Sequence, residues 1–287
     1  AGEREATWII ADYLDVVLHV FTAETRGNLV PCSCPKDPLG GLARRARFLA
    51  EATARGGRSA TTFLLDAGGF LPEGEVALRD GPEVASRYVR LLLRGFLSAG
   101  LEATAVDHRQ REFLRALAPA ETDRLRAALL EADPPGSPKI LRWGARRVAV
   151  LALEESCTDS TVIRAGVAAR AQADHLIVLA RADAVSGRRL AHLSGADLVL
   201  LSRGARPTEP LREGGSLLVG CGTEGREVGE VRLVPGAHPP EPEARLRLVS
   251  FTLHPMNAQM PEDPDLARQV AGLLREAGPG AFAGASE

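Results

Sequence analysis

Short, unbroken apolar runs separated by turn-forming residues constrain the fold of this chain most strongly. These runs occupy residues 16–21, 62–65, 148–153, 175–180, 197–201 and 217–220. Continuous apolar runs of this length are typical of strands that are covered on both faces. Helical periodicity fills the intervals at 42–54, 82–100, 161–173 and 186–195. Strands that alternate with helices predict a layered α/β fold.

The pattern changes towards the end of the chain. Residues 225–235 and 245–253 alternate apolar and polar at every second position, which predicts half-buried antiparallel strands. Residues 263–278 predict a closing amphipathic helix. No linker long enough to divide the chain is present. We therefore expect one domain over residues 1–287, with its core at about 15–274, a lead-in at 1–14 and a frayed tail at 279–287.

Composition excludes several classes of protein. The chain has 287 residues, is 45% hydrophobic, and carries a formal charge of −2 with a pI of about 6.4. No basic excess indicates a nucleic-acid partner. No apolar run approaches the roughly 18 residues that a transmembrane helix needs. We expect neither nucleic-acid binding nor a transmembrane segment.

The chain has four cysteines, which are Cys32, Cys34, Cys157 and Cys221. Four are too few for a disulfide scaffold in a chain of this length. Cys32 and Cys34 could supply two ligands of a soft-metal site, but a closed zinc site needs four, and no clustered Cys or His pair completes it. The favoured interpretation is loop thiols, or one or two isolated disulfides.

Four blocks of sequence, in order, resemble the calcineurin-like metallophosphoesterases, and in particular the catalytic domain of the bacterial 5'-nucleotidase and UDP-sugar hydrolase group. The blocks are "TAETRGNLVPCSC" with "PLGGLARRA"; "LLDAGGFL"; "ADHLIVLARAD" with "LSGADLVLLSRGARP"; and "GTEGREVGEVRL" with "EDPDLARQV". The resemblance runs from about residue 15 to about 274. It implies a four-layer α-β-β-α sandwich of the metallophosphoesterase type. It also implies two divalent metals, which would clamp a phosphate and activate a bridging water.

The family's metal-ligand motifs are Asp-x-His, Gly-Asp, Asn-His, a lone His and Gly-His-x-His. The resemblance places their ligand positions on Glu24, Arg26, Gly69, Asp107, His108, Arg181, Arg203 and Ala205. Two of these motifs can each be aligned with this sequence in two ways. Asn-His falls on residues 107–108 or 108–109, and Gly-His-x-His falls on 202–205 or 203–206. The bridging Asp of the family falls on Gly69, so the bridging carboxylate is missing.

The residue types at these positions predict the loss of the metal centre. Arginine stays protonated and has no lone pair to offer a metal, and glycine has no side chain. At best Glu24, Asp107 and His108 could still act as ligands. None of the six histidines pairs with a carboxylate at the expected spacing, which disfavours an intact site elsewhere. We predict the fold without its two-metal centre, with two divalent metals as the alternative.

Arg26, Arg181 and Arg203 would meet at the same strand ends if this fold is right. Guanidinium groups suit phosphate and carboxylate, so these three are candidate anion-binding residues. The favoured interpretation is simpler: they pair with nearby carboxylates and fill the old cavity. The expected partners are Glu24, Asp66, Asp107 and Asp183.

Three functions follow as hypotheses. The first is a non-catalytic, 5'-nucleotidase-like protein acting as a structural or accessory subunit or binding module, as inactive domains of this family do elsewhere. The second is a metal-dependent hydrolase of nucleotides or nucleotide sugars with an atypical site. The third is a metal-free binder of a phosphorylated small molecule. For the first we expect other protein subunits as partners, and the resemblance implies a periplasmic or cell-surface location.

Overall fold

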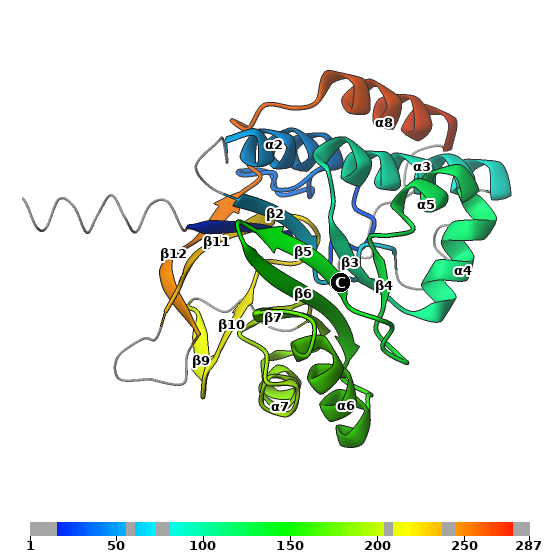
Figure 1. Ribbon diagram of the computed structural model, residues 1–287. Helices are drawn as coiled ribbons and strands as arrows, with labels where there is room; N and C mark the ends of the chain where they lie inside the picture. Colours follow the sequence, from blue (N-terminus) through cyan, green and yellow to red (C-terminus); the bar gives the residue numbers. More distant parts are fainter. Residues whose placement is uncertain (1–15, 56–60, 73–80, 204–208, 237–244, 278–287) are drawn as a thin grey trace, which may run out of the picture.

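A computed structural model of the chain describes residues 16–55, 61–72, 81–203, 209–236 and 245–277 (Figure 1). The predicted lead-in at 1–14 and tail at 279–287 lie outside the described residues. None of the helices that the structure describes is long and apolar enough to cross a membrane.

Two six-stranded sheets form the centre of the molecule. The first has the order β12-β11-β1-β2-β3-β4 and the second the order β5-β6-β7-β8-β10-β9. The strands of the first sheet are β1 Val17–Thr22, β2 Thr61–Asp66, β3 Ala103–Val106, β4 Leu129–Glu131, β11 Glu227–Pro235 and β12 Leu246–Pro255. Those of the second are β5 Lys139–Trp143, β6 Arg146–Glu154, β7 His175–Arg181, β8 Leu198–Leu201, β9 Leu211–Glu213 and β10 Ser216–Gly220.

Helices cover the outer face of each sheet (Figure 1). Over the first sheet lie α2 Leu42–Arg55, α3 Pro82–Ala99, α4 His108–Leu117, α5 Pro119–Leu125 and α8 Pro264–Ala277. Over the second lie α6 Asp159–Arg170 and α7 Ala184–Ser194. The two sheets pack face to face, because one apolar cluster draws its residues from both. The predicted four-layer α-β-β-α sandwich is confirmed.

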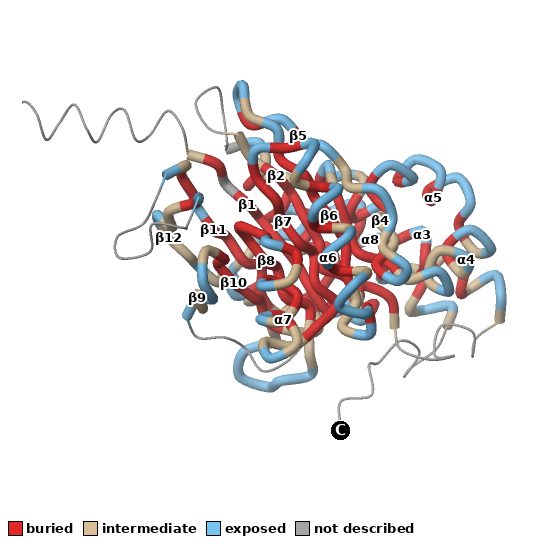
Figure 2. The backbone as a smooth tube through the Cα atoms, turned by 60° about the horizontal axis from the view of Figure 1, so that its bottom comes forward, coloured by how far each residue is buried: buried red, intermediate tan, exposed pale blue. Residues whose placement is uncertain are grey.

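Alternation along each strand divides its side chains between two apolar layers. In β1 and β2, Val20 and Leu64 pack against the helices, whereas Phe21 and Leu65 pack between the sheets. Because both faces are covered, the described side chains of β1 and residues 63–66 of β2 are buried (Figure 2). The unbroken apolar runs of the sequence therefore correspond to strands of the inner layers.

The two alternating segments near the end are β11 and β12, and both are antiparallel as predicted. The expectation that both are half-buried is correct only for β12, at the sheet edge. β11 lies between β1 and β12, and its residues are almost all buried. Its polar positions are accommodated partly by ion pairs, as between Glu230 and Arg232, whose Oε1 and Nη2 lie 2.9 Å apart.

Parallel strands place their carboxyl ends together. β1, β2, β3 and β4 run parallel in the first sheet, and β6, β7, β8 and β10 run parallel in the second. The residues that follow these strands lie at one end of the sandwich. This end carries the candidate site.

Candidate functional site

The loop after β1 is bound by its backbone to the loop after β2. Glu24 N donates to Gly68 O at 2.9 Å, and Arg26 N donates to Gly69 O at 2.9 Å. Both Glu24 and Arg26 have left-handed backbones, with φ of 42° and 47°. Such φ values are uncommon outside glycine and persist only where the surroundings hold them. These hydrogen bonds fix where the two side chains can point.

Glu24 occupies the space that a side chain at position 69 would need. A Cβ atom built on Gly69 would lie 2.3 Å from Glu24 Oε1. At Gly68, a Cβ would lie 3.0 Å from Arg181 Cγ. The volume in front of the β2 loop is therefore filled by a carboxylate from one loop and an arginine stem from the other sheet.

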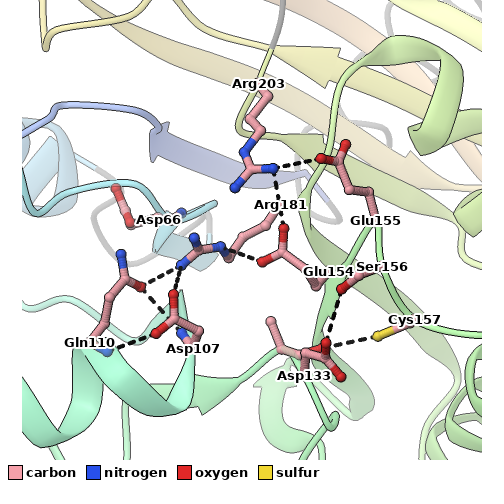
Figure 3. Close-up of polar contacts among 12 residues, drawn as sticks. Asp66, Asp107, Gln110, Asp133, Glu154, Glu155, Ser156, Cys157, Arg181 and Arg203 are labelled. Atoms are coloured by element: carbon pink, nitrogen blue, oxygen red, sulfur yellow. Dashed lines mark hydrogen bonds and ion pairs between the residues drawn. The ribbon is translucent and has the colours of Figure 1, made fainter. Parts of the chain in front are cut away.

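Arg181 ends β7 and is the buried centre of the site, with 9% of its side chain exposed (Figure 3). Its Nε lies 2.7 Å from Glu154 Oε2, and its Nη1 lies 3.3 Å from Asp107 Oδ2. Nη1 also donates to Gln110 Oε1. Burial raises the pKa of Glu154, and the neighbouring Arg181 and Arg203 oppose that rise.

Arg203 and Arg26 lie nearer the surface. Arg203 Nη1 is 2.6 Å from Glu155 Oε1 and 3.4 Å from Glu154 Oε1. Arg26 Nε is 3.3 Å from Glu24 Oε2. They expose 39% and 45% of their side chains, respectively. All three arginines of the site thus face carboxylates.

We call these residues the arginine–carboxylate network. Its members are Glu24, Arg26, Asp107, Gln110, Glu154, Glu155, Arg181 and Arg203. Glu24 also contributes to the electrostatic environment of Arg203, which joins the two ends of the network.

Two of the expected carboxylate partners lie elsewhere. Asp183 caps α7 by accepting a hydrogen bond from Ser186 N at 2.8 Å. Asp66 faces the helix layer, because it is out of phase with Leu65 on β2. The hypothesis that these two pair with the arginines is therefore wrong.

Asp66 is instead the acceptor of a buried structural cluster. Thr22 Oγ1 donates to it at 2.6 Å, Thr104 Oγ1 at 2.7 Å, and Gly68 N at 2.9 Å. Burial raises the pKa of Asp66 to about 6, although these hydrogen bonds and the buried Arg45 oppose the rise. The cluster links β1, β2 and β3 directly beneath the site loops.

The Asn-His motif could align with residues 107–108 or 108–109 in the loop after β3, and of these residues Asp107 reaches the site. Asp107 caps α4, accepts from Gln110 N at 2.7 Å, and contacts Arg181. His108, the first residue of α4, is exposed, and so is Arg109. The candidate His108 is therefore not brought to the network. Ala205 and its neighbours at 204–208 lie outside the described residues.

Sequence reasoning missed Glu154, Glu155 and Gln110. In β6, Val148, Val150 and Ala152 face the inner layer and Glu154 continues the same alternation, but the sequence alone does not show which face of this strand is the inner one. Gln110 stands at the third position of a capping box with Asp107, which is a recognisable start of a helix.

The donor set does not fit a two-metal centre. Of the predicted ligand positions in the described part of the chain, Gly69 offers no donor and three are arginines. Glu24 and Asp107 are turned towards arginines. Among the described residues, no group of three or more His, Cys, Asp or Glu side chains is arranged to hold a metal ion.

No protein-family model matches the sequence, and no curated protein matches it either. Solved structures do match. A sulfate thiohydrolase, SoxB, of Thermus thermophilus in complex with glycerol is 14% identical with a TM-score of 0.69, covering 90% of this chain and 60% of that one. A 5'-nucleotidase precursor from Thermus thermophilus is 15% identical with a TM-score of 0.66, covering 91% and 58%.

The calcineurin-like phosphoesterase YfkN from Bacillus subtilis is 11% identical with a TM-score of 0.61, covering 92% of this chain and 98% of that one. At these identities the likeness concerns the fold. The chain therefore has the fold of the calcineurin-like phosphoesterases and 5'-nucleotidases, as the resemblance implied. It spans about three fifths of the length of the first two structures.

Proposed function

We propose that this chain is a non-catalytic, 5'-nucleotidase-like protein of metallophosphoesterase fold that acts as a structural or accessory subunit or binding module. One observation carries the proposal. The arginine–carboxylate network fills the end of the sandwich where the resemblance places two metals, and three of its members are arginines that cannot ligate a metal.

The packing around position 69 is a second observation that supports the proposal. Glu24 Oε1 lies where a side chain at position 69 would stand, so a bridging carboxylate from the loop after β2 has room only if the Glu24 side chain turns away. That loop is held by hydrogen bonds to Gly68 and Gly69. Position 69 therefore lacks the expected metal ligand, and the Glu24 side chain occupies the space that this ligand would need.

Metal content and turnover test the proposal together. We expect no bound transition metal after Mn²⁺ loading and desalting, and no chelator-sensitive hydrolysis of p-nitrophenyl phosphate, AMP or a UDP-sugar. A phosphoesterase of the same fold with intact ligand motifs, handled identically, is the positive control. Two metals per chain with turnover abolished by chelator would overturn the proposal and favour a hydrolase with an atypical site.

A metal-free binder of a phosphorylated small molecule is the second candidate, because Arg26 and Arg203 expose 45% and 39% of their side chains. Calorimetric titration with AMP and inorganic phosphate tests it. If it holds, Arg203→Gln weakens binding about 10-fold, the usual loss for one charge-assisted hydrogen bond. The matched control is Arg47→Gln on α2, whose Arg47 pairs with Glu51 away from the network. No saturable binding, or equal binding by both variants, rejects this candidate.

Partners and location follow as parts of the same proposal. A subunit without catalysis implies other protein subunits as partners. The likeness to a 5'-nucleotidase precursor supports placement in the periplasm or at the cell surface. Affinity purification of the tagged chain from fractionated cells tests both, and recovery from the cytoplasm alone would contradict the location.

A further inference from the structure

A short loop with two thiols lies beside the candidate site. Pro31 and Gly40 form an antiparallel bridge that closes its base. Cys32 N donates to Leu39 O at 2.8 Å, and Leu39 N donates to Cys32 Sγ at 3.3 Å. The sulfur of Cys32 is therefore held by the backbone of its own loop. Cys32 is partly buried and Cys34 is exposed.

The two thiols stand two residues apart in this loop, and a cation lies near them. Cys32 and Cys34 influence each other's ionisation, and Arg226 attracts the thiolate of either. Slight burial raises the pKa of Cys32, but the neighbouring Cys34, the Leu39 amide and Arg226 lower it on balance. The neighbouring Cys32 raises the pKa of Cys34. Of the two thiols, Cys32 is therefore the more easily ionised.

The loop is connected to the site by a series of contacts. Arg226 is paired with Glu224, whose backbone N donates to Glu24 O at 2.6 Å. Glu224 has a left-handed backbone, with φ of 59°. Asn28 Nδ2 also donates to Glu224 O at 3.3 Å. These contacts fix Arg226 relative to the β1 loop that begins the dithiol segment.

We propose that Cys32 and Cys34 form a redox-active dithiol that exchanges with disulfides of small thiols or of proteins. The Cys32 thiolate attacks one sulfur of the disulfide, the S–S bond breaks, and a thiolate leaves and takes up a proton. Cys34 then loses its proton and attacks Cys32 Sγ in the mixed disulfide. The second thiol leaves and a Cys32–Cys34 bond forms. Two electrons and two protons pass from the dithiol to the disulfide.

The surroundings favour this chemistry over capture of a soft metal ion. Arg226 stabilises a thiolate but repels a metal cation. No third His, Cys, Asp or Glu completes a ligand group with the two sulfurs among the described residues. A disulfide between residues two apart closes a small strained ring, and strained, exposed disulfides are readily reduced again. The two cysteines are therefore suited to alternate between the reduced dithiol and the disulfide. This inference does not depend on the absence of catalysis at the network.

The remaining cysteines provide controls within the same chain. Burial raises the pKa of Cys157 and of Cys221, and both are buried in the apolar layers. Under native conditions they should stay unmodified while Cys32 and Cys34 react. Their modification at the same rate would show that the reagent reaches unfolded protein rather than the loop.

The test treats the reduced, folded full chain with oxidised glutathione and maps the products by mass spectrometry. We expect the peptide that holds both cysteines to lose two hydrogens without retaining glutathione. Cys34→Ser should accumulate the mixed disulfide on Cys32, because the resolving thiol is missing. Cys32→Ser should react about 10-fold more slowly. Arg226→Gln should slow the wild-type reaction about threefold, the effect of one nearby surface charge.

Two results would overturn the proposal. One is accumulation of glutathione on both cysteines of the wild-type chain with no internal disulfide, together with equal rates for the two serine variants. The other is a stoichiometric Zn²⁺ or Cu⁺ complex that is lost in either serine variant and that blocks the exchange reaction. Circular dichroism of each variant confirms that it is folded before the reaction.

Discussion

Replacing Arg181 by methionine is expected to lower the free energy of unfolding by about 3 kcal/mol, because the mostly buried Glu154 loses its closest cation and keeps only the more distant, partly exposed Arg203. Glu154 exposes only 12% of its side chain and lies 2.7 Å from Arg181 Nε. Methionine keeps an apolar stem over Gly68, so the loss reports the charge rather than a cavity. Urea denaturation of both proteins at pH 7.0 measures the difference.

Two further variants make this result specific. Arg203→Met removes a cation that is 39% exposed and should cost under about 1 kcal/mol, since solvent screens its pairs. Arg181→Met combined with Glu154→Gln should recover part of the loss, because the carboxylate that lost its closest cation is removed as well. If Arg181→Met and Arg203→Met lower the free energy of unfolding by the same amount, the network is a surface feature and does not stabilise the end of the sandwich.

Acidification is expected to destabilise the chain through His19, which lies between the two sheets and is 1% exposed. Burial lowers the pKa of His19 from 6.5 to about 3, and the nearby His175 contributes to that lowering. The folded pKa lies below the unfolded one, so the unfolded chain binds the proton first as pH falls. Stability therefore rises with pH across the window from about 3 to 6.5.

The size of this effect follows from the shift. Between pH 7 and pH 4, His19 should account for about 3 kcal/mol of lost stability. His19→Leu should remove that share of the pH dependence, whereas His192→Gln, at an exposed position on α7, should not. Asp66 acts in the opposite direction between pH values of about 4 and 6, because burial raises its pKa. Asp66 is present in the wild type and in both variants, so its contribution cancels when their pH dependences are compared. Equal slopes for His19→Leu and the wild type would contradict the prediction.

The elements of the fold were largely predictable because their signals are local. The apolar runs of β1, β2, β6, β7, β8 and β10 were all expected, as were α2, α3, α6, α7 and α8. The strands and helices that were missed are short or polar. β3, β4 and β9 have four, three and three residues, which is too few to show a period. α4 has one buried residue, Leu114, and its other core contacts, Phe113 and Leu117, also lie in its second half, so its apolar signal is short.

The candidate site was predictable in part. The carboxyl ends of parallel strands meet at one edge, so Glu24, Asp107 and Arg181 could be placed together from the expected positions of the ligand motifs. Which carboxylate pairs with which arginine could not be derived in that way. Asp66 looked as suitable as Glu154, but one faces the helices and the other faces the opposite sheet. In a strand that is apolar on both faces, the sequence does not reveal which face is which.

The amino-acid sequence by itself determined the alternation of strands and helices and the residue types at the strand ends. It also determined that arginine and glycine stand where metal donors are expected, since donor chemistry belongs to the side chain alone. Only the tertiary structure decided that Glu24 fills the space in front of Gly69 and that Glu154 and Asp107 share Arg181. Those contacts join residues far apart in the chain, and they depend on how two sheets stack and on which side chains that stacking turns inward.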